Sequence, residues 1–90
     1  MNFATDLSAK LSGTGIKVEA APGFAAELGG GEAASLCLGD KTVMVSFDFE
    51  ACVNRDVWTL HGKKTDAYYY QERTWLNAIR KVFNLPRRAA

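Results

Sequence analysis

Cysteine, proline and histidine are scarce in this sequence of 90 residues, which has two cysteines, two prolines and one histidine. Two cysteines do not make the disulfide framework that staples many small secreted domains. One histidine and two cysteines also lack the ligand number and spacing of a zinc site. The glycines at 29–31 are not followed by the lysine, serine or threonine of a phosphate-binding loop. We therefore expect no bound metal and no cofactor.

Long apolar runs are absent as well. No run approaches the roughly 18 residues that a membrane-spanning helix needs, and the N-terminus lacks the basic and then apolar pattern of a signal peptide. We expect a cytoplasmic protein with free thiols and no membrane partner. The apolar share of 48% and the ten aromatic residues are typical of a packed chain rather than a disordered one. This length predicts a single domain over residues 1–90.

The clearest pattern lies in the middle of the chain, at residues 42–52. Apolar side chains occupy every second position, with mostly polar side chains between them. The pattern predicts a long strand with one buried face. That face consists of Val43, Val45, Phe47, Phe49 and Ala51.

Turn signals on both sides of this strand predict its two neighbours. Residues 39–40, Gly-Asp, are typical of a two-residue hairpin turn. Closing that turn sets residues 34–38 against residues 41–45, with apolar side chains opposite apolar ones. A second two-residue turn at residues 54–55 pairs the far end of the strand with residues 56–61. Both hairpins bury the same face of the long strand, which is the agreement expected of a folding sequence.

The flanking segments complete the predicted fold. Spacings of three and four between apolar residues predict a short helix at residues 2–11 and a long one at residues 67–84. Residues 16–20 and 24–28 are interpreted as a further hairpin, with a helix at 24–28 as the alternative. We predict an α+β fold, an antiparallel β-meander of four to five strands flanked by an N-terminal and a C-terminal helix. Both helices pack on one face, and the other face stays open.

The charges are unevenly distributed although the net charge is only +1. Residues 1–62 carry four basic and eight acidic side chains, which gives −4, whereas residues 63–90 carry seven basic and two acidic ones, which gives +5. A basic C-terminal element on an acidic body indicates a charged partner, although basic residues are also favoured at the C-terminus of any helix. The predicted partner-binding residues are Tyr70, Arg73, Asn77, Arg80, Lys81, Arg87 and Arg88.

The leading functional hypothesis is a small non-enzymatic protein-binding module. Its size and the absence of a cofactor motif suggest an inhibitor or adaptor of a larger complex, a class that includes phage-encoded inhibitors of bacterial defence of the anti-CRISPR type. The partner would present an acidic surface to the basic helix face and tail. The open face of the sheet is the alternative interaction surface.

Three other hypotheses remain open. The same basic element can bind nucleic acid, with affinity that falls steeply with salt. The open sheet face or an edge strand can form a homodimer. The predicted register sets Asp48 opposite His61, which suggests a small enzyme. Because neither Cys37 nor Cys52 reaches His61 in that register, a cysteine nucleophile is missing and we expect no catalysis.

Overall fold

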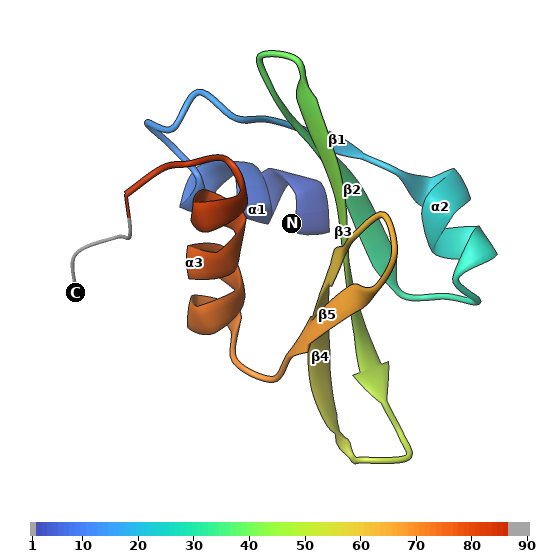
Figure 1. The fold of residues 1–90 in the computed structure, drawn as a ribbon. Helices are drawn as coiled ribbons and strands as arrows, with labels where there is room; N and C mark the ends of the chain where they lie inside the picture. Colours follow the sequence, from blue (N-terminus) through green and yellow to red (C-terminus); the bar gives the residue numbers. More distant parts are fainter. Residues whose placement is uncertain (1, 87–90) are drawn as a thin grey trace.

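A computed structural model describes residues 2–86 and contains a five-stranded antiparallel sheet with helices on both of its faces (Figure 1). The strands follow one another in chain order across the sheet, as a meander does. The α+β fold with an N-terminal and a C-terminal helix is therefore confirmed. The elements are α1 (Phe3–Lys10), β1 (Lys17–Ala20), α2 (Pro22–Glu27), β2 (Glu32–Leu38), β3 (Lys41–Glu50), β4 (Arg55–His61), β5 (Asp66–Tyr69) and α3 (Glu72–Val82).

The hydrophobic core lies between the sheet and the pair α1 and α3, which cover the same face (Figure 1). Val45, a member of the predicted buried face, is fully buried, and the apolar stripe of α3 packs against it. Burying side chains of this size contributes about 1.5–3 kcal/mol each. The buried core residues are Leu7, Leu11, Ile16, Ala34, Leu36, Val45, Leu60, Trp75, Ile79 and Phe83.

Polar contacts hold the two helices in place over this core. The Trp75 indole nitrogen donates a buried hydrogen bond of 3.2 Å to the Thr59 carbonyl oxygen of β4. The Lys10 ammonium at the end of α1 lies 2.7 Å from the Glu72 carboxylate at the start of α3 and 2.9 Å from Asp6. Hydrogen bonds to Glu72 and then to Asp6 raise the pKa of Lys10 above its ordinary value of 10.5.

Of the two predicted hairpins that include the central strand, one has the predicted register and the other does not. Strands β2 and β3 pair as expected, with Leu36 opposite Val43. Strands β3 and β4 close through a four-residue turn at residues 51–54, where Asn54 adopts a left-handed φ of 52°. Each β3 residue therefore meets a β4 residue four positions earlier than predicted. Because the difference is even, every side chain keeps its face, and alternation alone did not distinguish the two registers.

Two predicted elements have a different secondary structure. Helix α2 replaces the strand expected at residues 24–28, which agrees with the alternative stated for that segment, and β1 pairs with β2 instead. Pro22 lies in the first turn of α2, a position that suits the fixed φ of proline. Residues 66–69 form strand β5 instead of the first turn of the long helix, which fits the strand preference of tyrosine. The sheet thus has five strands, but residues 66–69 form the fifth one in place of the strand expected at residues 24–28.

The open face is also partly covered, contrary to the prediction. Helix α2 lies on the side of the sheet opposite α1 and α3 (Figure 1), and the ring of Phe24 meets His61 edge-on at 4.9 Å between centroids. At the end of β3 the predicted burial of Phe49 is wrong, since 53% of its surface is exposed. Phe49 pairs with Asp56 near the end of the β3–β4 hairpin, and the tip of that hairpin reaches beyond the helices in Figure 1.

Both cysteine thiols are free, with Cys37 half-buried and Cys52 exposed. In residues 2–86, none of the helices combines the length and the apolar character that crossing a bilayer requires.

Candidate functional site

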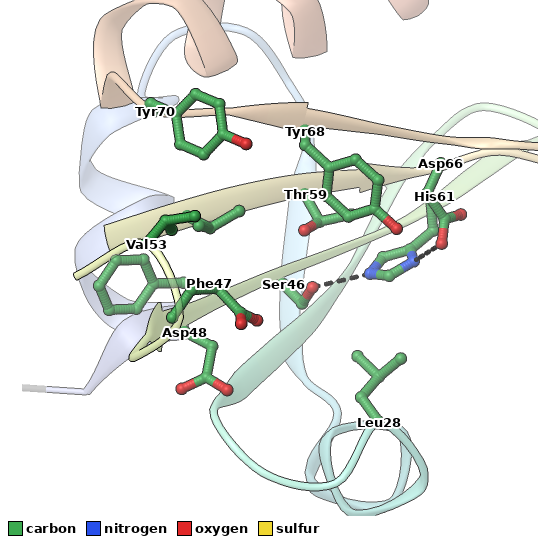
Figure 2. Close-up of a pocket in the computed structure, with 12 residues that line it drawn as sticks. Leu28, Ser46, Phe47, Asp48, Val53, Thr59, His61, Asp66, Tyr68 and Tyr70 are labelled. Carbon is green, nitrogen blue, oxygen red and sulfur yellow. Dashed lines mark hydrogen bonds and ion pairs between the residues drawn. The ribbon is translucent and has the colours of Figure 1, made fainter. Parts of the chain in front are cut away.

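A cavity of about 420 Å³ opens on the sheet face that α1 and α3 leave free. Strands β3, β4 and β5 form its floor and one wall, and Leu28 at the end of α2 forms the other (Figure 2). The lining residues are Leu28, Ser46, Phe47, Asp48, Glu50, Val53, Val57, Thr59, His61, Asp66, Tyr68 and Tyr70.

The floor of the cavity is polar because strand alternation turns the polar face of β3 and β4 toward it. Ser46 pairs with Thr59 across the two strands, and Thr59 pairs with Tyr68 of β5. His61 pairs with Asp66 in the adjacent row. Directly opposed cross-strand side chains have Cβ atoms about 4.5–5.5 Å apart. Three strands therefore bring hydroxyl, imidazole and carboxylate groups within reach of one another.

Ser46, His61 and Asp66 form a continuous polar chain at one end of this floor (Figure 2). The Ser46 Oγ lies 2.7 Å from His61 Nε2. On the other side of the ring, His61 Nδ1 lies 3.3 Å from Asp66 Oδ2. The facing carboxylate favours the tautomer with its proton on Nδ1, so that Nε2 accepts a hydrogen bond from the Ser46 hydroxyl.

Packing and polar contacts fix the orientation of the His61 side chain. Its side chain is only 12% exposed, and the Phe24 ring of α2 packs against it. The other oxygen of Asp66, Oδ1, accepts a hydrogen bond of 3.3 Å from the Gly62 backbone nitrogen in the β4–β5 connection. Such outer contacts fix the orientation of a functional histidine and of its carboxylate partner.

The pairing of Asp48 with His61 predicted from the sequence is wrong. Asp48 lies opposite Val57, and His61 lies opposite Met44. Asp66 is the carboxylate that reaches the imidazole. Asp66 was missed because the residues that follow it were interpreted as the start of the long helix at residues 67–84. The signal that could have identified it is the short connection at residues 62–65, which returns the chain antiparallel beside β4.

The rim of the cavity is apolar and aromatic. Leu28, Val53, Tyr68 and Tyr70 line it and are all exposed. The Arg55 guanidinium stacks on the Tyr70 ring, 4.4 Å from its centroid. Carboxylates supply the charge, since Asp48, Glu50 and Asp66 are among the lining residues, and no lysine or arginine of residues 2–86 is. The cavity thus combines apolar contact area with negative charge.

The partner-binding residues predicted from the sequence do not form one site. Tyr70 lies at the rim of the cavity, whereas Arg73, Asn77 and Lys81 line a different groove, of about 670 Å³, along the outer side of α3. Arg80 is half-buried on the same helix. Tyr70 is separated from the other predicted residues because it follows strand β5 and precedes α3, so it is not part of that helix. Two predicted residues, Arg87 and Arg88, lie outside the described part of the chain.

Residues 2–86 contain no group of three or more histidine, cysteine, aspartate or glutamate side chains that could hold a metal ion. No protein-family model, curated protein sequence or solved structure shows significant similarity to this chain.

Proposed function

We propose that this chain is a small cytoplasmic protein-binding module, an inhibitor or adaptor of a larger complex, that engages its partner through the cavity on the sheet. The supporting observation is the position of the exposed apolar side chains. Of the five large ones among residues 2–86, all but Phe49 line this cavity. Exposed apolar side chains gathered in one place mark interaction sites, and tyrosine is favoured at the centre of interfaces.

The chemistry of the cavity specifies the partner segment. Its three carboxylates, Asp48, Glu50 and Asp66, favour a positively charged group. A volume of about 420 Å³ is in the range of small-ligand sites, about 300–1,000 Å³. It holds one or two side chains rather than a folded element. We therefore propose a short exposed segment with a lysine or arginine beside apolar residues.

The test compares two surface variants as baits for partner capture from a lysate of the native host, before and after nuclease treatment. The double variant Tyr68→Ala and Val53→Ser alters the rim, where both side chains are exposed. Charge reversal of Arg73 and Lys81 on α3 is the matched control. We expect the rim variant to lose the captured protein at least tenfold while the α3 variant retains it. The opposite pattern would overturn the proposal. Circular dichroism establishes that each variant is folded.

A second candidate, nucleic-acid binding, is supported by the groove on α3. Arg73, Asn77 and Lys81 line it together with Tyr69, and cationic groups along a groove are suited to phosphates. This candidate predicts that affinity for an oligonucleotide falls steeply between 50 and 200 mM salt, roughly tenfold or more. Charge reversal at Arg73 and Lys81 would abolish it. Capture that disappears after nuclease treatment would favour this candidate.

Self-association through the same sheet face is a third outcome of these experiments. Sedimentation equilibrium at two protein concentrations distinguishes it, because a homodimer dissociates on dilution.

A further inference from the structure

We propose that Ser46 is a nucleophile that His61 activates and Asp66 orients, and that the cavity transfers acyl groups from small neutral or cationic esters. This reaction goes beyond the binding role proposed above. The inference is based on which atoms of the three side chains face one another. The serine Oγ faces Nε2 of the imidazole at 2.7 Å, and the carboxylate faces Nδ1 at 3.3 Å. A nucleophile, a base and an orienting group in this order define an acyl-transfer site by geometry, independently of fold.

The position of Ser46 gives its hydroxyl access to a ligand. Ser46 is 7% exposed and belongs to the cavity lining, so a substrate enters from the cavity side alone. The sheet behind Ser46 and the Phe24 ring beside His61 keep the pair away from bulk water. Charge interactions are stronger in such a desolvated setting than at an open surface.

Side-chain hydroxyls can stabilise the oxyanion that forms during the attack. The backbone amides beside Ser46 lie within strand pairs on both sides of β3, so they belong to the sheet rather than to the cavity. Thr59 lies directly opposite Ser46, and Tyr68 lies opposite Thr59. In Figure 2 the Thr59 and Tyr68 side chains stand on the same side of the sheet as Ser46. Hydroxyl donors at such positions serve as an oxyanion hole.

The cavity also determines which esters fit. Asp48, Glu50 and Asp66 repel an anionic substrate, whereas neutral and cationic esters meet no such barrier. The volume of about 420 Å³ limits the acyl and alcohol groups to small ones. Leu28 and Tyr68 supply apolar contact on opposite walls (Figure 2).

The reaction has two balanced steps. Ser46 Oγ forms a bond to the ester carbonyl carbon, the bond from that carbon to the alcohol oxygen breaks, and His61 Nε2 carries the serine proton to the leaving alcohol. Water then attacks the acyl-serine, and its proton passes through the same nitrogen to Ser46 as the acid leaves. Asp66 stays ionised throughout and acts as a positioning residue.

The test uses the full chain and a fluorophosphonate probe, which bonds to an activated serine with loss of fluoride. We expect one probe per chain by intact mass, located on Ser46 by peptide fragmentation. Ser46→Ala should abolish the adduct. Ser35→Ala, which alters another serine on the same sheet face, should leave it unchanged. His61→Gln should slow labelling by about 10²- to 10⁴-fold, the usual contribution of a general base.

Several outcomes would overturn the proposal. They are no adduct on the folded wild-type chain, an adduct on Tyr68 or Tyr70 instead of Ser46, or an unchanged labelling rate in His61→Gln. Because wild-type labelling is read directly, a variant that fails to fold does not decide the result. Probe labelling and partner capture are separate measurements on the wild-type chain, so failure of the reaction and failure of the binding role are distinguishable.

Discussion

Replacing Trp75 by phenylalanine tests how the last helix is held on the sheet. The Trp75 side chain is fully buried, and its indole nitrogen donates to the Thr59 carbonyl oxygen at 3.2 Å. Phenylalanine lacks that donor and is three heavy atoms smaller. The lost hydrogen bond costs about 1 kcal/mol. The loss of two buried carbon groups costs about 0.8 kcal/mol each, without the additional cost of any cavity that is left behind. We therefore expect the free energy of unfolding to fall by about 2–3 kcal/mol.

This loss is large for a domain of 90 residues, whose total stability is roughly 5–13 kcal/mol. The variant should remain folded, with a Tm about 10–20 °C lower, given about 4–8 °C per kcal/mol at this size. Urea denaturation followed by far-UV circular dichroism measures the change in free energy.

The matched control is the same substitution at Trp58. That side chain is half-buried and packs on the Phe47 ring with centroids 5.1 Å apart. We expect it to lose about 1 kcal/mol or less, because a half-buried group loses less transfer free energy. Equal losses at both positions, or a loss below 1 kcal/mol at Trp75, would refute the packing of α3 described above.

Three further predictions concern single positions. Gly31→Ala should destabilise the protein by about 2–4 kcal/mol in urea denaturation, because a Cβ there would lie 2.6 Å from a backbone oxygen of β3. The control Gly29→Ala has a similar positive φ but open space around the added Cβ, so it should cost only about 1–2 kcal/mol. Ile79→Asp places a charge at a fully buried core position, so circular dichroism should show an unfolded chain. Lys10→Gln should cost less than 1 kcal/mol at neutral pH. The pKa of Lys10 is raised in the folded state, so its contribution to the free energy of unfolding is complete below pH 10.5 and is lost as the pH rises through the raised pKa. In urea denaturation at alkaline pH, the difference in stability between the variant and the wild type should therefore shrink.

Much of the fold could be predicted from local patterns. The alternation at residues 42–52 identified the central strand, and the Gly-Asp turn at residues 39–40 set the register of β2 against β3. The helical spacing within residues 67–84 predicted a helix packed on the sheet, and Trp75 and Ile79 of that segment are fully buried. These predictions succeeded because strand and helix periods are properties of consecutive residues, and the hydrophobic effect acts on each face as a whole.

The candidate site could be predicted only in part. The polar face of β3 was identified, but the imidazole was paired with the wrong carboxylate, Asp48, and Tyr70 was placed on the wrong element. Both errors have a physical cause. A turn centred two residues earlier in the chain shifts the β3–β4 register by four residues, an even step that leaves the alternation unchanged. Residues 66–69 form strand β5 because they pair with β4, and the local sequence of this segment does not reveal that pairing.

The sequence by itself therefore determined which face of the central strand β3 packs against the core, because that choice depends on alternation within the segment. Only the tertiary structure decided which of the cavity-facing groups touch. Ser46, His61 and Asp66 come from three different strands, and their contact depends on turn lengths and strand pairing, which bring together residues that are distant along the chain.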